Sequence, residues 1–105
     1  MVNYIERENG SAIEYADGSK HWYLYDKLHR EDGPAVEFSD GSKRWYLNGS
    51  LHREDGPAIE QNGSKYWYKY GKRHREDGPA AEFASGKKEY WVNGKLIKTT
   101  WDKNI

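Results

Sequence analysis

The sequence contains no cysteine and no long apolar run. The absence of cysteine excludes disulfides, thiolate metal sites and cysteine nucleophiles. No segment approaches the roughly 20 apolar residues of a membrane-spanning helix, and the first residues, Met1 to Tyr4, lack the basic and apolar regions of a signal peptide. We therefore expect a cytoplasmic protein.

Aliphatic residues are also scarce, and neither sign of charge is in excess. Only 15 residues are Leu, Ile, Val or Phe, and the mean hydropathy is −1.19, a combination typical of disordered chains. The 5 Trp and 9 Tyr argue against disorder, because each large ring buries roughly 150–250 Å². We expect a single domain with a thin aromatic core. Because 17 basic residues balance 17 acidic ones, general binding to nucleic acid or anionic lipid is not expected.

One heptad, His-Arg-Glu-Asp-Gly-Pro-Ala, occurs three times, at residues 29–35, 52–58 and 74–80. Around these heptads, Trp22, Trp45, Trp67 and Tyr90 form one column at steps of 23, 22 and 23 residues. A fixed period of this length is typical of stacked supersecondary units. The sequence predicts four units, at approximately residues 5–27, 28–50, 51–72 and 73–95, followed by a C-terminal cap at 96–105.

Frequent turn signals predict that the units are β-hairpins. Asp-Gly, Asn-Gly and Tyr-Gly pairs separate short runs rich in Trp, Tyr, Val and Ile, and no stretch between them suits a helix of ordinary length. A three-residue loop at 39–41 and a two-residue turn at 62–63 give the same register despite their different lengths. The predicted pairs are Glu14–Lys20, Glu37–Lys43, Glu60–Lys65 and Glu82–Lys88, together with Ala12–Trp22, Ala35–Trp45, Ala58–Trp67 and Ala80–Tyr90.

The second turn of each unit predicts a further set of opposed residues. Asn48-Gly49 places Trp45 opposite His52 and Tyr46 opposite Leu51, and the same spacing gives Trp22–His29 and Trp67–His74. Gly-Pro inside each heptad interrupts ladder pairing, because proline has no N–H and glycine permits a kink. The predicted fold is all-β, with four hairpin units of about 23 residues, roughly two strands each, in an elongated, twisted antiparallel meander sheet.

Residues 45–58 resemble the variant form of the MORN repeat. Both have an aromatic pair, an Asn-Gly turn, a His position, a Gly and then a β-run, although Arg-Glu-Asp and the Pro after Gly depart from the ordinary MORN unit. The resemblance implies a β-hairpin solenoid used for binding. It also implies kinship with bacterial and phage-encoded proteins, including antitoxin-like partners of toxins.

The repeated polar residues do not predict catalysis, which needs one asymmetric set of groups around a reacting atom. Equivalent side chains in a stack of two-stranded units lie about 10 Å apart, whereas metal ligands lie about 2 Å from one ion. His29, His52 and His74 therefore cannot share a metal, and no metal or cofactor is expected. We predict that each histidine stacks on the neighbouring indole, and that Ile97 takes the corresponding place opposite Tyr90.

The charged columns have both structural and binding interpretations. Asp32, Asp55 and Asp77 precede Gly-Pro and suit turn formation, with the preceding arginine bridging to a carboxylate. Alternatively, Arg30, Arg53 and Arg75, with Trp22, Trp45 and Trp67, hold a small anionic ligand such as a nucleotide. Lys20, Lys43, Lys65 and Lys88 lie beside aromatic residues, as in single-strand binders, but each is predicted opposite a glutamate, which favours cross-strand ion pairs.

A second aromatic column lies on the opposite face of the predicted sheet, at Tyr23, Tyr46, Tyr68 and Trp91. A single layer cannot bury both faces, so this column is the predicted partner-binding surface. The leading hypothesis is a non-catalytic protein that neutralises a protein partner by covering it, as an antitoxin, immunity protein or phage counter-defence factor does. The alternative is sequestration of a small anionic ligand. Open sheet edges also make a homodimer possible.

Overall fold

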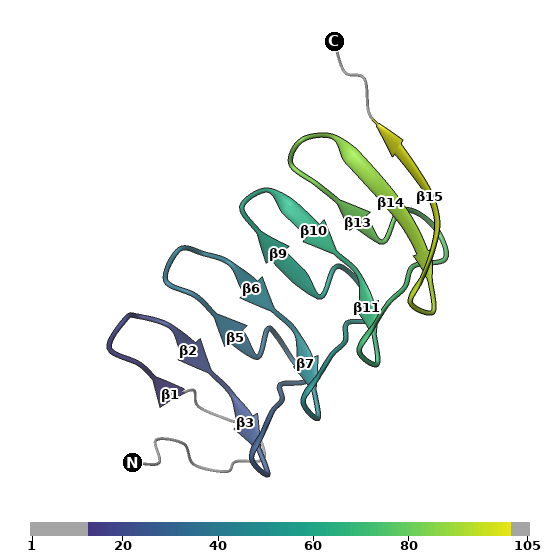
Figure 1. Ribbon diagram of the computed structural model, residues 1–105. Coiled ribbons are helices and arrows are strands. Elements are labelled where there is room, and N and C mark those ends of the chain that lie inside the picture. Colours follow the sequence, from purple (N-terminus) through teal and green to yellow (C-terminus); the bar gives the residue numbers. More distant parts are fainter. Residues whose placement is uncertain (1–12, 102–105) are drawn as a thin grey trace.

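A computed structural model describes residues 13–101. This part of the chain is all-β, without a helix, and contains fifteen short strands. Nine of them form one antiparallel sheet in the order β1-β2-β5-β6-β9-β10-β13-β14-β15 (Figure 1). The molecule is elongated, with principal-axis extents of 48 × 27 × 22 Å. Residues 13–101 contain no helix long and apolar enough to cross a membrane.

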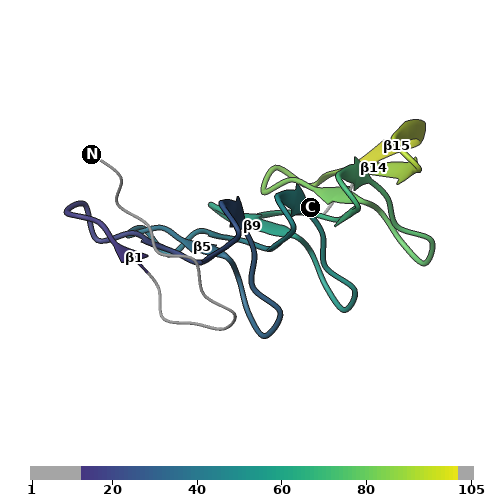
Figure 2. The ribbon, with the colours of Figure 1, turned by 90° about the horizontal axis from the view of Figure 1, so that it is seen from below.

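The strands divide into sheet strands and lateral hairpins. The sheet strands are β1 (Ile13–Glu14), β2 (Lys20–His21), β5 (Val36–Glu37), β6 (Lys43–Arg44), β9 (Ile59–Gln61), β10 (Ser64–Tyr66), β13 (Ala81–Glu82), β14 (Lys87–Val92) and β15 (Lys95–Trp101). Three two-stranded lateral hairpins comprise β3 (Tyr23–Leu24) with β4 (Lys27–Leu28), β7 (Tyr46–Leu47) with β8 (Ser50–Leu51), and β11 (Tyr68–Lys69) with β12 (Lys72–Arg73). These hairpins loop out to one side of the sheet (Figure 2).

The register predicted from the turns is confirmed. Glu14–Lys20, Glu37–Lys43, Glu60–Lys65 and Glu82–Lys88 are all paired. Gly41 closes its three-residue loop at φ 93°, and Asn62 and Gly63 have φ 51° and 82° in the two-residue turn. Both loops need left-handed backbone at these positions, which explains the residues found there. In the lateral hairpins, Tyr46 lies opposite Leu51, as predicted.

The expected pairing of each alanine with the tryptophan of its own hairpin is wrong. The N–H of Ala35 donates to the carbonyl of Arg44, whereas the N–H of Trp45 donates to the carbonyl of Ala58. The next hairpin repeats this arrangement, since the N–H of Ala58 donates to the carbonyl of Tyr66 and the N–H of Trp67 donates to the carbonyl of Ala80. The N–H of Ala80 donates to the carbonyl of Glu89 rather than to that of Tyr90. Ala12 lies outside the described residues. The cause is that the chain leaves the sheet at each tryptophan to enter a lateral hairpin. The second turns predicted these hairpins, but the sequence-based meander of about two strands per unit did not place them outside the main sheet.

The buried core consists of small and medium residues. Ala35, Val36, Ala58, Ile59, Ala80 and Ala81 are the buried hydrophobic residues of the described chain. The indoles of Trp22, Trp45 and Trp67 are only half-buried. The predicted aromatic core is therefore wrong in detail. The buried hydrophobic residues are alanine and β-branched side chains, and the rings stay half-buried because a single sheet provides no second layer to enclose them.

Ile97 does not lie opposite Tyr90, contrary to the prediction. A bulge between Tyr90 and Trp91 shifts the register of β14 and β15, so Lys98 pairs with Tyr90. The ammonium of Lys98 lies 4.7 Å from the Tyr90 ring centre, and Ile97 is 61% exposed. An extra residue in one strand changes the register beyond it, which spacing alone does not reveal.

Candidate functional site

The three heptads connect neighbouring hairpins outside the sheet. The N–H of His52 donates to the carbonyl of Trp45, and the N–H of Arg53, the next residue, donates to the carbonyl of Tyr68 in the following hairpin. His29–Arg30 and His74–Arg75 make the corresponding bonds. The Glu-Asp-Gly-Pro segment that follows has no strand pairing, as expected for Gly-Pro. Each heptad therefore bridges two hairpins and carries its charged side chains beyond the sheet.

The arginine of each heptad lies between an indole and a glycine. The guanidinium carbon of Arg53 is 3.7 Å from the Trp45 ring centre, and a Cβ added at Gly56 would lie 2.9 Å from that same carbon. Arg30 lies over Trp22 at 3.7 Å and Arg75 over Trp67 at 4.0 Å, with Gly33 and Gly78 in equivalent positions. The planar guanidinium fills this slot, which favours arginine over lysine.

The Nε and Nη1 donors of each heptad arginine are used within the protein. Arg53 donates from Nε to Asp55 at 3.1 Å and from Nη1 to the carbonyl of Pro57 at 3.0 Å and to Glu60 at 3.3 Å. The same bonds recur around Arg30 and Arg75. The predicted bridge from arginine to carboxylate is therefore confirmed. The carboxylate of Asp55 accepts from Arg53, so the aspartate holds the Glu-Asp-Gly-Pro turn by binding the arginine.

The histidines hold the tips of the following hairpins. The buried His52 accepts a hydrogen bond at Nδ1 from the N–H of Tyr70 at 2.9 Å, and its Nε2 lies 2.8 Å from Glu54. His29 and His74 accept from the N–H groups of Asn48 and Asn93, also at 2.9 Å. Acceptance at Nδ1 requires the proton on Nε2, which then donates to the glutamate. The predicted role of these histidines in stacking on indoles is wrong, because the guanidinium takes that place and the imidazole binds the adjacent tip.

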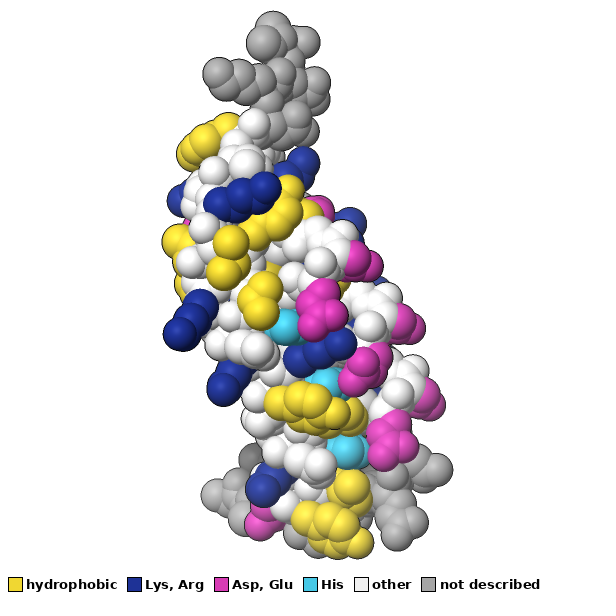
Figure 3. All heavy atoms as spheres, turned by 90° about the vertical axis from the view of Figure 1, so that its right-hand side faces the viewer, with side chains coloured by type: hydrophobic (Ala, Val, Ile, Leu, Met, Phe, Trp, Pro, Cys, Tyr) yellow, Lys and Arg dark blue, Asp and Glu magenta, His cyan; other side chains and the backbone are white. Residues whose placement is uncertain are grey.

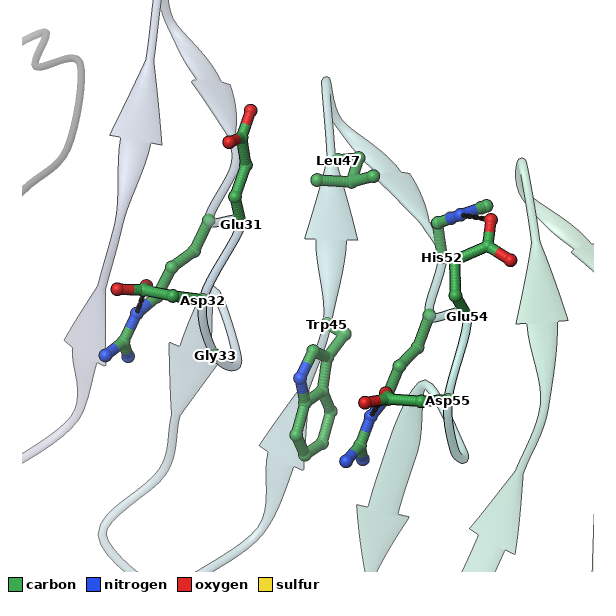
Figure 4. Close-up of a pocket in the computed structure, with 10 residues that line it drawn as sticks. Glu31, Asp32, Gly33, Trp45, Leu47, His52, Glu54 and Asp55 are labelled. Carbon is green, nitrogen blue, oxygen red and sulfur yellow. Dashed lines mark hydrogen bonds and ion pairs between the residues drawn. The ribbon is translucent and has the colours of Figure 1, made fainter.

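Two grooves lie between successive heptads. The first groove has a volume of about 530 Å³ and is lined by Arg30, Glu31, Asp32, Gly33, Trp45, Leu47, His52, Arg53, Glu54 and Asp55. The second groove, of about 570 Å³, is lined by Arg53, Glu54, Asp55, Gly56, Pro57, Trp67, Lys69, His74, Arg75, Glu76 and Asp77. In Figure 4 the Trp45 indole stands between Asp32 on one heptad and Asp55 on the next. Each groove thus combines an indole with the acidic ends of two heptads.

Exposed carboxylates dominate the charge of the grooves. The side chains of Glu31, Asp32, Glu54, Asp55, Glu76 and Asp77 are 65–87% exposed. Figure 3 shows acidic side chains following one another along the molecule beside the histidines. Hydrogen bonding by His52 and the nearby Lys69 lower the pKa of Glu54, which keeps this carboxylate ionised. The first groove has four carboxylates against two guanidinium groups, so it is negative overall.

The structure separates the two sets of predicted site residues. Arg30, Arg53, Arg75, Trp45 and Trp67, proposed for an anionic ligand, line the grooves, whereas Trp22 lines neither of them. The predicted partner-binding column, Tyr23, Tyr46, Tyr68 and Trp91, lies outside both grooves and is half-buried. Arg73 lies 5.3 Å from the ring centres of both Tyr68 and Trp91 and donates to the Tyr68 hydroxyl.

Burial, followed by contact with Tyr15, raises the pKa of Tyr23 to about 12.

Two of the predicted ion pairs between strands, those of Lys43 and Lys65, are not formed. Lys43 and Lys65 lie opposite glutamates in the ladder, yet neither makes an ion pair within residues 13–101. Glu60 instead contacts Arg53, and Glu82 contacts Arg75. The arginines reach these carboxylates across the heptad, a contact that strand register alone does not predict.

Sequence reasoning missed the exposed aromatics at the hairpin tips. Tyr25 and Tyr70 are 65% and 74% exposed, and both have φ 49°. The Tyr70 ring lies 4.2 Å from the His52 ring. In an alignment of the repeats, Tyr25 and Tyr70 fall where the other hairpin tips have Asn48 and Asn93. This difference could have identified the two tyrosines, since bulky residues rarely adopt left-handed backbone.

Comparisons with known proteins give no relative: no family model, curated protein or solved structure matches this chain. The resemblance of residues 45–58 to variant MORN repeats therefore rests on the sequence pattern. Within residues 13–101, no cluster of three or more His, Asp or Glu side chains is arranged to hold a metal ion.

Proposed function

We propose that this chain is a non-catalytic binding protein that blocks a protein partner by covering it with the heptad side. We interpret its architecture as four stacked hairpin units of about 23 residues, the arrangement that variant MORN repeats imply. The observation that carries the proposal is the pair of successive grooves, each lined by a tryptophan, a histidine and two Arg-Glu-Asp runs, lying along a molecule 48 Å long. Equivalent sites in a row suit an extended surface better than a single small molecule.

The charge of the grooves indicates the chemistry of the partner surface. Six exposed carboxylates on three heptads attract Lys and Arg side chains, and the Trp45 and Trp67 indoles provide flat apolar contacts between them. A small anion is less favoured there, because Nε and Nη1 of Arg53 already bind Asp, Glu and proline carbonyl groups. We therefore expect a basic protein surface as the partner.

The proposal is tested by capture followed by titration. The purified chain is used to isolate proteins from the organism that encodes it, and each captured protein is repurified and titrated calorimetrically. We expect one stoichiometric complex whose affinity falls as salt rises. The double variant Glu31→Lys with Glu76→Lys should weaken it at least about tenfold, since it reverses charge in both grooves.

A matched control separates a groove effect from a general charge effect. Asp26→Lys reverses an exposed charge on a hairpin tip that lines neither groove, and should leave binding unchanged. Equal weakening by the control would place the binding surface elsewhere. A melting-temperature rise with a nucleotide, in the absence of any protein partner, would favour the small-ligand alternative.

A further inference from the structure

The outer edge of β15 is open in the part of the chain that the structure describes. β15 (Lys95–Trp101) is the longest strand, pairs only with β14, and ends the nine-stranded order (Figure 1). It also carries three exposed large hydrophobic residues: Leu96, Ile97 and Trp101 are 49%, 61% and 59% exposed. An open edge of this length, with apolar side chains, is a template for pairing with another strand.

β15 occupies the place that the first strand of a hairpin takes elsewhere in the sheet. Thr100 pairs with Lys88 and Thr99 with Glu89. In the same way, Glu37 of β5 pairs with Lys20, and Glu60 of β9 pairs with Lys43. β5 and β9 each have another strand on their far side, whereas β15 has none among the described residues. The sheet geometry therefore continues outward from β15.

The direction of the free backbone groups follows from the ladder. The N–H of Phe83 donates to the carbonyl of Lys87, so the hydrogen-bonding groups of Lys87 and, by alternation, of Glu89 point towards β13. Those of Lys88 and Tyr90 then point towards β15, where they meet Thr100 and Lys98. On β15 this leaves the backbone groups of Thr99 and Trp101 directed outward.

We propose that β15 pairs antiparallel with β15 of a second copy of this chain, with Thr99 opposite its own equivalent. In this register the outward backbone groups of the two copies bond to each other. Ile97 of each copy lies opposite Trp101 of the other, and a β-branched residue opposite an aromatic one stabilises a pair of strands. Lys98 then lies opposite Thr100.

Neighbouring registers are less favourable. Shifting one way places Lys98 opposite Lys98, where like charges repel. Shifting the other way places Thr99 opposite Trp101 and removes both contacts between Ile97 and Trp101. The chosen register is thus the self-complementary one, which commits the edge to a second copy.

The test combines sedimentation equilibrium with amide hydrogen exchange of the full chain. We expect a reversible dimer in which the amides of Thr99 and Trp101 become protected as concentration rises. The amides of Lys98 and Thr100, which bond β14, should be protected at every concentration. A chain that stays monomeric up to about 1 mM overturns the proposal.

Variants distinguish this edge from other contacts. Thr99→Pro removes an outward N–H, which edge strands tolerate, and should abolish the dimer while the monomer remains folded. Trp101→Ala should raise the dimer Kd about tenfold, because symmetry removes two contacts. Thr100→Glu should tighten the dimer through Lys98 of the second copy, and Thr100→Lys should weaken it. A dimer insensitive to Thr99→Pro, or equal responses to Glu and Lys at position 100, would refute the pairing.

Discussion

The guanidinium carbon of Arg53 lies 3.7 Å from the ring centre of Trp45, and a Cβ added at Gly56 would lie 2.9 Å from that carbon. This slot explains most of the heptad. Arginine supplies a planar cation for the indole, Asp55 and Glu60 neutralise it, and glycine leaves room for it. The arrangement recurs around Arg30 and Arg75. The repeated charges of the heptads thus serve the fold first, while their outer carboxylates remain exposed.

Arg53→Lys should destabilise the protein by about 1–3 kcal/mol, because lysine provides neither the planar stack nor the directed Nε and Nη1 bonds. Urea unfolding measures the change. A double-mutant cycle with Trp45→Leu should show coupling of about 0.5–2 kcal/mol. Lys43→Ala, at an exposed position without an ion pair in residues 13–101, is the control and should change stability by less than about 0.5 kcal/mol.

Gly56→Ala should cost about 1–3 kcal/mol, because its Cβ would lie 2.9 Å from the guanidinium carbon of Arg53, and moving that group away breaks its bonds to Asp55 and Pro57. The expected loss is smaller in an Arg53→Ala background, where the obstructing group is absent. Unfolding of the two single variants and the double variant tests this. Equal costs in both backgrounds would show that backbone preference, rather than the arginine, selects glycine.

His52→Phe should destabilise the protein by about 1–3 kcal/mol, since it leaves the Tyr70 N–H without its acceptor beside a buried ring. Hydrogen exchange provides the specific measurement: the Tyr70 amide should exchange faster. The Asn48 amide, which His29 holds, is the internal control and should keep its rate. Similar acceleration at both amides would indicate general loosening.

Stability should fall on acidification partly through His21. Burial lowers the pKa of His21 from 6.5, opposed by the charge of Asp17, and its Nδ1 is buried without a hydrogen-bond partner. A lowered pKa means that the unfolded chain binds the proton more readily. His21 therefore does not change the free energy of unfolding well above its pKa in the unfolded chain, and it lowers that free energy as the pH falls below about 6.5.

The measurement compares unfolding free energies at pH 8 and pH 5 for the wild type and His21→Phe. The variant should lose less stability between these values. The other described histidines are common to both proteins, so the difference isolates His21. Identical losses would contradict the prediction.

Asp26→Gly should stabilise the protein by up to about 1 kcal/mol. Asp26 has φ 69°, whereas the corresponding places in three other hairpins are Gly49, Gly71 and Gly94, with φ between 80° and 83°. Asp26→Ala is the control, because alanine gains no freedom in left-handed backbone and should not stabilise. Thermal unfolding of both variants distinguishes the turn effect from removal of the charge.

Local chemistry determined the strands and their register. Asn62-Gly63 and the loop closed by Gly41 require left-handed backbone at known places, and alternation along a strand then fixes which residues face each other. The Glu37–Lys43 and Glu60–Lys65 pairs could therefore be predicted from the sequence. The kink at Gly-Pro was predictable for the same reason, since it depends on two adjacent residues.

Tertiary structure decided which side chains meet once the chain leaves the sheet. The bend at Trp45 turns its backbone towards Ala58, and it brings Arg53, rather than His52, over the indole. His52 reaches the Tyr70 tip, 18 residues away, and Glu60 is taken by Arg53 instead of Lys65. Turn types and alternation specify only neighbours along a ladder. Contacts between a heptad and the next hairpin depend on the three-dimensional step between them, which no local pattern in the sequence records.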